Sequence, residues 1–285
     1  MFEGFDHRRF DTGDCEIAAV VGGSGPPLLL VHGYPQTHVM WHRVAPSLAE
    51  RFTVVAPDLR GYGASDKPAA GADYASYAKR TMATDLVEVM SQLGHDRFAV
   101  VGHDRGARVS YRMALDHPDR VTKLVTLDII PTLDTFEAAA GRGARALWHW
   151  FFLAKPPPFP ERMIAAERRL FLETVLGDWT GDRGAITDEA FAEYLDAWTD
   201  DTIRATCDDY RAGARIDCTH DAADRNEGRT IGCPMLALWG GEDRDLLPVW
   251  RRWASDVTGR GIDCGHFMAE EAPDEVLAAV LPFLV

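Results

Sequence analysis

Five short apolar runs are spaced along the chain, and glycine, proline or aspartate bounds each of them. Runs of about four to eight aliphatic residues without polar alternation are typical of strands that are buried on both faces. Parallel sheets covered by helices contain strands of this kind. The predicted strands are residues 28–31, 52–56, 98–101, 123–127 and 235–239.

Helical periodicity fills the stretches between several of these runs. In residues 77–93, apolar side chains recur every three or four positions, as they do on one face of a helix. A second helix is predicted for residues 109–117, after Gly106 and before Pro118. This alternation predicts an α/β fold with a mostly parallel central sheet and helices on both faces.

The rhythm changes between residues 131 and 229, where no convincing strand appears. The segment contains aromatic clusters and helical periodicity within residues 163–176 and 191–198. We therefore predict a helical cap inserted into the α/β core, with Trp148 packed in the interior of the cap. The predicted division is residues 1–130 for the first part of the core, 131–229 for the cap and 230–285 for the second part of the core.

Composition and charge limit the partners of the protein. The 285 residues include 44 acidic and 30 basic side chains, which gives a formal net charge of −14 at pH 7. Such acidity argues against nucleic acid and anionic membranes as partners, and no apolar run approaches the roughly 18 residues of a membrane helix. The five cysteines form no C-x-x-C pair, and the N-terminus lacks an apolar secretory region. We expect a cytoplasmic protein in a reducing compartment.

The sharpest chemical signal follows the third predicted strand. Gly102 and Gly106 flank Asp104 in a G-x-D-x-G pattern that connects a strand to a helix. This spacing is typical of a tight turn that holds a nucleophile above the sheet, and serine is its usual occupant. A carboxylate at this position suits attack on a saturated carbon, which gives an ester intermediate. The alternative is a glycine-rich turn in which Asp104 caps the following helix.

A histidine near the C-terminus could complete such a site. His266 follows the last predicted strand, where a histidine could activate water to hydrolyse an ester at Asp104. Two acids compete to orient His266, because Asp128 and Asp243 each follow the carboxyl end of a predicted strand. The residues alone leave this choice open, since either acid could also serve in a turn or a cap.

Backbone N–H groups could stabilise the tetrahedral step of such a hydrolysis. The N–H groups of Tyr34, in the loop after the first predicted strand, and of Arg105 would together form an oxyanion hole. The glycine-rich loop of residues 58–65 lacks the spacing of a phosphate-binding loop, so we expect it to have a structural role.

Motifs spread over nearly the whole chain resemble those of the haloacetate (fluoroacetate) dehalogenases of the α/β-hydrolase superfamily. The motifs are His32-Gly33-Tyr34-Pro35-Gln36, Asp58-Leu59-Arg60-Gly61-Tyr62-Gly63, Gly102-His103-Asp104-Arg105-Gly106, Leu127-Asp128-Ile129-Ile130-Pro131, Trp148-His149-Trp150, Asp209-Tyr210-Arg211-Ala212-Gly213 and Gly265-His266-Phe267. Epoxide hydrolases and other relatives share the first two. The Asp-Arg-x-x-Arg pattern and the Trp-His-Trp motif are much more specific.

The resemblance implies a reaction and its central residues. Asp104 would displace halide from the α-carbon of a haloacetate, and His266 would then deprotonate the water that hydrolyses the ester, with Asp128 as its partner. The family is commonly dimeric and uses no metal or organic cofactor. The resemblance thus implies a homodimeric enzyme whose ligands are a small anionic haloacid and water.

The resemblance also assigns the groups that hold the two ends of the substrate. Arg105 and Arg108 would bind the carboxylate, and their place at the start of a helix agrees with this role, since two guanidinium groups reverse the acidic field locally. The donors to the departing halide would be His149, Trp150 and Tyr210.

Other functions remain open on the same residues. An epoxide hydrolase would also use aspartate, acid and histidine, with two cap tyrosines such as Tyr194 and Tyr210. The arginine pair argues against that reaction and against a haloalkane dehalogenase, because neither substrate carries a charge. The haloacetate dehalogenases tend to lack an acid at the position of Asp243, whereas many other α/β-hydrolases have their catalytic acid there. A non-catalytic small-molecule receptor on the same fold is the alternative from another class.

Overall fold

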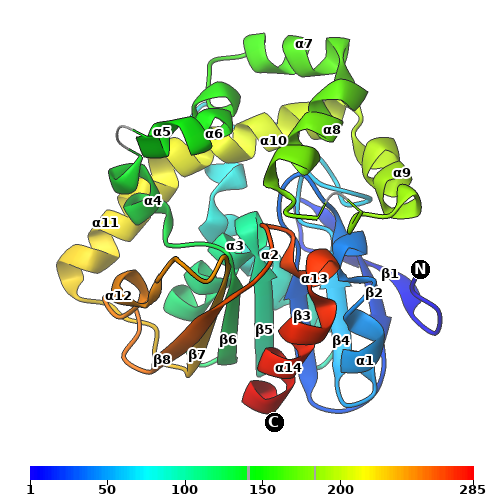
Figure 1. Ribbon diagram of the computed structural model, residues 1–285, viewed down its shortest axis with the longest axis vertical. Coiled ribbons are helices and arrows are strands. Elements are labelled where there is room, and N and C mark those ends of the chain that lie inside the picture. Colours follow the sequence, from blue (N-terminus) through cyan, green and yellow to red (C-terminus); the bar gives the residue numbers. More distant parts are fainter. Residues whose placement is uncertain (140–141, 183) are drawn as a thin grey trace.

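The computed structural model describes residues 1–139, 142–182 and 184–285, and its centre is an eight-stranded sheet (Figure 1). The strands are β1 (Asp6–Asp11), β2 (Glu16–Gly22), β3 (Pro27–Val31), β4 (Thr53–Pro57), β5 (Phe98–His103), β6 (Val121–Leu127), β7 (Met235–Gly240) and β8 (Val257–Ile262). Their order across the sheet is β1-β2-β4-β3-β5-β6-β7-β8. β2 is antiparallel to both neighbours, and the pairs from β4 to β8 are parallel.

The predicted mostly parallel sheet is confirmed. The five predicted strands match β3 to β7 to within two residues at each end. The prediction omits β1, β2 and β8. β1 and β8 are edge strands in which exposed residues interrupt the apolar pattern. β2 is as buried as the predicted strands, and no physical feature of its sequence explains why the prediction omits it.

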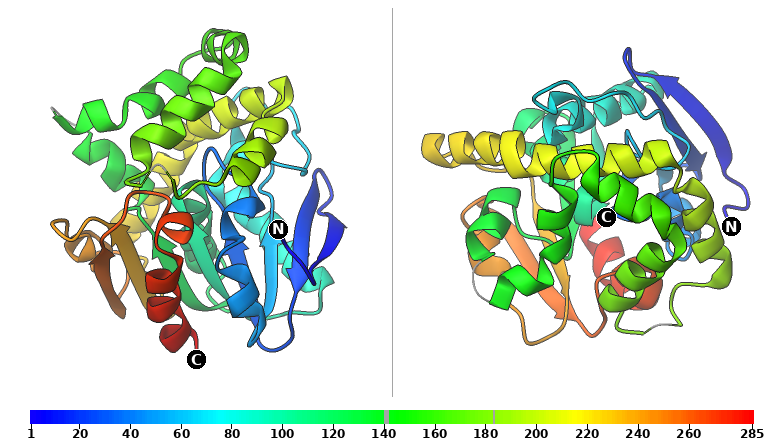
Figure 2. Two further views of the ribbon diagram at one scale, coloured as in Figure 1. Left: turned by 45° about the vertical axis from the view of Figure 1, so that its right-hand side comes forward. Right: turned by 90° about the horizontal axis from the view of Figure 1, so that it is seen from above.

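Helices cover both faces of the sheet, as predicted. The core helices are α1 (Ala45–Ala49), α2 (Lys79–Gln92), α3 (Asp104–Asp116), α12 (Leu247–Trp250), α13 (Met268–Glu271) and α14 (Pro273–Leu284), with short turns η1 (His38–Trp41) and η2 (Ala75–Tyr77). α2 and α3 lie on one face, and α1 and α14 lie on the other (Figures 1 and 2). α3 begins at Asp104, five residues before the predicted start, because Gly106 belongs to its first turn and does not precede it.

The chain between β6 and β7 forms a layer of helices that lies over the carboxyl ends of the parallel strands (Figure 1). Its elements are α4 (Thr132–Ala138), α5 (Arg142–Ala146), α6 (Trp148–Leu153), α7 (Phe159–Ala166), α8 (Arg168–Trp179), α9 (Asp188–Ala197), α10 (Asp200–Ala212), the π-helical turn η3 (Gly213–Asp217) and α11 (Cys218–Glu227). We call residues 131–229 the helical layer. The described residues of this layer form no strand. α10, η3 and α11 follow one another as one long rod across it (Figure 2).

Trp148 does not pack in the interior of the helical layer, which corrects the expectation from the sequence. Its exposed fraction is 37%, whereas that of Trp150 is 4%, although both lie on the short helix α6. Successive helical side chains point about 100° apart. His149 and Trp150 therefore occupy the buried side of α6, and Trp148 falls on its outer side.

No helix in the described part of the chain combines the length and the apolar character needed to cross a membrane.

Gly106 lies where the first turn of α3 passes closest to β3. A Cβ atom there would come within 2.2 Å of the carbonyl oxygen of His32 and 2.3 Å of that of Val31. We expect Gly106→Ala to lower the free energy of unfolding by about 3 kcal/mol, because backbone on both sides would have to move. Urea titration measures this loss.

The matched control for that variant is Gly177→Ala. Gly177 lies inside α8, where a Cβ atom would meet nothing within 4 Å. Alanine there should leave the free energy of unfolding unchanged or raise it by up to about 1 kcal/mol, since glycine is a poor helix former. Equal stability of the Gly106 and Gly177 variants would contradict the close packing of α3 on β3.

Candidate active site

A strained turn between β5 and α3 raises the carboxylate of Asp104 above the sheet. Asp104 has φ of 45°, a left-handed conformation that costs free energy for a residue with a Cβ atom. The positions on either side must be glycine, because a larger side chain would clash with neighbouring atoms. A Cβ atom at Gly102 would lie 2.4 Å from Oγ of Ser110, and one at Gly106 would meet β3. The G-x-D-x-G pattern therefore forms the tight turn that its spacing predicts.

The two oxygens of the Asp104 carboxylate have different surroundings. The backbone N–H of Tyr34 donates a hydrogen bond to Oδ1 at 2.8 Å. Oδ2 lies 3.8 Å from Nε2 of His266. Burial raises the pKa of Asp104, but the charges of His266 and Arg108 outweigh it and bring the pKa below its ordinary value. The side chain is thus an ionised carboxylate, with one oxygen held and the other directed toward the histidine.

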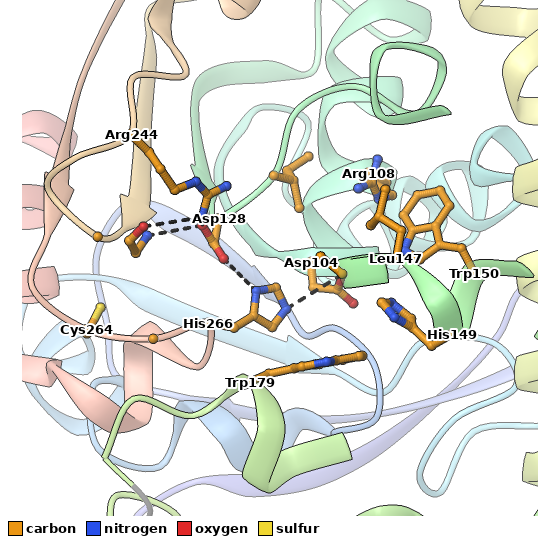
Figure 3. A pocket seen from close by; sticks show the side chains of 15 residues that line it. Asp104, Arg108, Asp128, Leu147, His149, Trp150, Trp179, Arg244, Cys264 and His266 are labelled. Carbon is orange, nitrogen blue, oxygen red and sulfur yellow. Dashed lines mark hydrogen bonds and ion pairs between the residues drawn. The ribbon is translucent and has the colours of Figure 1, made fainter. Parts of the chain in front are cut away.

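His266 is paired with Asp128. Nδ1 of His266 lies 2.7 Å from Oδ2 of Asp128, which leaves Nε2 facing Asp104 (Figure 3). Burial lowers the pKa of His266, but the hydrogen bond to Asp128 outweighs it and the net pKa is raised. Asp243, the other acid considered from the sequence, is exposed. Of the two acids, the structure brings Asp128 to the histidine.

The two arginines of the Asp-Arg-x-x-Arg pattern are not equivalent. Arg105 is fully buried and forms a two-pronged ion pair with Asp209, with Nε at 2.9 Å from Oδ2 and Nη2 at 2.7 Å from Oδ1. The same carboxylate accepts a hydrogen bond from Tyr62 at 2.7 Å and pairs with Lys79. The positive charge of Arg105 is therefore compensated within the protein, and its Nη1 is buried without a partner in the described residues.

Arg108 has no carboxylate partner among the described residues. Its Nη1 donates to the carbonyl oxygen of Ile130 at 2.9 Å, and the hydroxyl of Thr135 lies within 3.4 Å of the guanidinium group. The guanidinium also lies 4.4 Å from the ring centroid of Trp150. Burial lowers the pKa of Arg108. The side chain is thus a fixed, buried cation that lines the cavity beside Asp104 and can accept an anion.

His149, Trp150 and Tyr210 come together in the helical layer above Asp104. The ring centroid of Tyr210 lies 5.9 Å from that of His149 and 5.8 Å from that of Trp150. Nδ1 of His149 and the hydroxyl of Tyr210 are buried and have no partner within the described residues. Burial lowers the pKa of His149 to about 3, so its imidazole is neutral. The group offers polar atoms in an otherwise apolar setting.

Asp104, Arg108, His149, Trp150 and His266 line one cavity of about 420 Å³ (Figure 3), whereas Arg105 and Tyr210 are not among its lining residues. This volume suits a small molecule. Its polar lining includes Asp104, Arg108, Asp128, His149, Arg244 and His266. No group of three or more metal-binding side chains was found in the part of the chain that is described.

Three features of the site have no counterpart in the sequence prediction. Trp179, at the end of α8, packs its ring 4.3 Å from that of His149 and lines the cavity. Asp209 holds Arg105 from behind and also pairs with Lys79. Arg244 contacts Asp128. Asp209 is the neighbour of Tyr210, and Arg244 is the neighbour of Asp243. Both therefore lie next to a residue that the sequence analysis names as a candidate.

Tyr194 is not part of the cavity lining. Its hydroxyl donates to Oε1 of Glu270 at 3.0 Å and accepts from Nε2 of Gln36 at 3.2 Å. Burial raises the pKa of Glu270 to about 8. The hydroxyl of Tyr194 is therefore committed to a buried polar cluster.

Comparisons with known proteins identify the family of the chain. The family model for the alpha/beta hydrolase fold matches residues 26–273. A fluoroacetate dehalogenase of Burkholderia sp is 46% identical, over 100% of this chain and 95% of its own length. A soluble epoxide hydrolase of Corynebacterium sp. (strain C12) is 39% identical, over 93% of this chain and 92% of its own. A solved α/β hydrolase from Nostoc sp PCC 7120 is 49% identical with a TM-score of 0.97, covering 100% of this chain and 99% of that one.

The protein belongs to the α/β-hydrolase family. Within that family, its resemblance to the haloacetate dehalogenases extends over the full chain.

The pairing of His266 can be tested without a substrate. Asp128→Asn should lower the pKa of His266, because burial then acts without the opposing carboxylate. NMR titration of the imidazole nitrogens measures the change. Asp243→Asn removes a nearby exposed acid and should leave the titration unchanged; the reverse result would make Asp243 the partner.

Proposed function

We propose that the protein hydrolyses a small 2-haloacid, such as a haloacetate, to the 2-hydroxy acid and halide through an ester at Asp104. One observation carries the proposal: a buried, ionised carboxylate and a buried arginine without a carboxylate partner in the described residues line the same small cavity. A substrate with an electrophilic carbon next to a carboxylate would satisfy both groups at once.

Binding and the first chemical step follow from this arrangement. The substrate carboxylate would pair with Arg108 and accept a hydrogen bond from Nη1 of Arg105. Oδ2 of Asp104 would then attack the α-carbon from the side opposite the halogen. A bond forms between Oδ2 and the carbon, and the carbon–halogen bond breaks with its electron pair leaving on the halide. Arg108 supplies most of the charge compensation, because Asp209 already neutralises Arg105.

The halide would leave toward His149, Trp150 and Tyr210. A departing fluoride gains more from hydrogen bonds than a departing chloride, because it concentrates its charge in a smaller volume. The unpartnered hydroxyl of Tyr210 and Nδ1 of His149 support this assignment. A neutral histidine with a proton on the nitrogen that faces the halide donates a hydrogen bond without a prior proton transfer.

Hydrolysis of the ester would use His266 and Asp128. Nε2 of His266 takes a proton from water, and the resulting hydroxide attacks Cγ of Asp104. Negative charge develops on Oδ1, where the N–H of Tyr34 already donates a hydrogen bond, and the N–H of Arg105 would add a second. As the tetrahedral intermediate collapses, His266 returns its proton to the leaving oxygen and the 2-hydroxy acid is released. Asp104 retains one oxygen from water, and its carboxyl group loses the remaining proton to solvent.

The helical layer would serve as the cap of this site, since residues of α6 and α8 line the cavity that contains Asp104. We further propose, from the resemblance stated above, a cytoplasmic homodimer that needs no metal or organic cofactor.

Epoxide hydrolysis is the second candidate, and the similarity to the Corynebacterium enzyme favours it. That reaction calls for two hydroxyl donors near the nucleophile. Tyr210 offers one, whereas the hydroxyl of Tyr194 is committed to Glu270. A neutral epoxide would also leave Arg108 uncompensated, so we rank this function second.

Side-by-side assays separate these functions. Halide release is measured from fluoroacetate, chloroacetate and a neutral chloroalkane, and diol formation is measured from styrene oxide. We expect turnover of a haloacetate at least tenfold faster than of the neutral compounds. In a single turnover in H₂¹⁸O the product should carry ¹⁶O from Asp104. Diol formation without halide release from haloacetates would overturn the proposal in favour of epoxide hydrolysis.

The role of Arg108 gives a second prediction. Arg108→Gln should lower kcat/KM for chloroacetate by roughly 10- to 100-fold, as expected for loss of a charge-assisted hydrogen bond of about 1.5–3 kcal/mol. Chloroacetamide has the same shape and no charge, so the variant should lose much less activity on it. An equal loss on both compounds would assign Arg108 a structural role.

A further inference from the structure

The loop after β7 places a cation against the partner of the histidine. The sequence drew attention to Asp243 in this loop, but that side chain is exposed. The side chain of its neighbour Arg244 is also exposed but reaches Asp128, where Nη1 donates to Oδ1 at 3.0 Å and to the carbonyl oxygen of Gly240 at 3.3 Å (Figure 3). The indole N–H of Trp239 donates to the carbonyl oxygen of Arg244 at 2.7 Å and fixes the backbone there.

Asp128 is therefore shared between two partners. Its Oδ2 contacts Nδ1 of His266 at 2.7 Å, and its Oδ1 accepts from Arg244 and from the N–H of Gly240 at 3.1 Å. The backbone of Asp128 is in a left-handed conformation with φ of 53°, which holds its carboxylate between these groups. The histidine thus shares its counter-charge with an arginine.

We propose that Arg244 is a positioning residue that shares the charge of Asp128 with His266 and so keeps His266 able to accept a proton from water near neutral pH. The proposal rests on the function proposed above, because it assigns Arg244 to hydrolysis of the ester. It gives Arg244 no part in formation of the ester. The physical reason is that an aspartate with no second partner binds an imidazolium more strongly, and an imidazolium is not a base.

The other groups that face His266 do not weaken the hold of Asp128 on the protonated imidazole as Arg244 does. Asp104 on α3 and Glu271 on α13 are carboxylates whose charges raise the pKa of His266. His103, at the end of β5, has its ring 4.6 Å from that of His266, and burial lowers its pKa to about 4, which leaves it neutral. His149, in the helical layer, is neutral for the same reason.

Cations oppose these carboxylates. Arg108 lies on the far side of Asp104 and pairs with the substrate carboxylate in the proposed reaction. Arg244 directly contacts the acid that holds His266. Its side chain is 52% exposed, so solvent moderates its effect.

The test follows the ester rather than overall turnover. Enzyme is mixed with chloroacetate, quenched at intervals and analysed by mass spectrometry, which gives the rates of ester formation and ester decay as functions of pH. Arg244→Gln removes the charge and keeps a hydrogen-bond donor, and Arg244→Lys keeps the charge. Arg251→Gln is the matched control, because Arg251 is an exposed arginine of the same region that forms no ion pair with the described residues.

We expect the midpoint of ester decay in Arg244→Gln to move to higher pH by up to about 0.7 units, which is what an exposed pair of up to about 1 kcal/mol gives. Below the midpoint, the ester should then decay up to about fivefold more slowly. The rate of ester formation should not change. Arg244→Lys should restore most of the shift, and Arg251→Gln should behave as the parent enzyme.

Two results would overturn the inference. An unshifted midpoint in Arg244→Gln would show that Arg244 does not act through Asp128. A higher KM with slower ester formation and an unshifted midpoint would assign Arg244 to substrate binding instead.

Failure of the proposed function would be recognised separately, because no haloacid would then form an ester with the parent enzyme. NMR titration of His266 in the resting protein still decides the inference in that case. The pKa of His266 must be higher in Arg244→Gln than in the parent chain and in Arg251→Gln.

Discussion

A buried carboxylate that must stay ionised is the constraint on which the site depends. Asp104 is only 6% exposed, so burial works against its charge. The N–H of Tyr34, the imidazole of His266 and the guanidinium of Arg108 offset that cost from three sides. The same three groups are those that the proposed reaction needs, at the oxyanion, at the water and at the substrate carboxylate. The interactions that keep Asp104 ionised in the resting site are thus the ones that the proposed reaction uses.

The core and the helical layer are joined by charge as well as by packing. Lys79 and Arg105 belong to the core, whereas Asp209 and Asp217 belong to the helical layer. Two cations and two carboxylates meet there in a buried cluster, so their formal charges cancel. This neutral cluster fixes Arg105 behind the cavity and leaves Arg108 as the cation that can respond to an anion.

Much of the site could be predicted because its residues are local in sequence or follow strand ends. The glycines around Asp104 specify a turn by themselves, and parallel strands bring their carboxyl ends to one edge of the sheet. The ion pair of Arg105 with Asp209 and the contact of Arg244 with Asp128 could not be predicted, since each joins residues more than a hundred positions apart. The exposure of Trp148 depends on how α6 is rotated, which a six-residue helix does not encode in its periodicity.

The most direct test of this account is covalent trapping on the His266→Gln variant. After reaction with chloroacetate, this variant should release about one chloride per chain and keep a carboxymethyl ester on Asp104, identified by peptide mass spectrometry. An ester on another residue, or continued chloride release from unmodified protein, would contradict it.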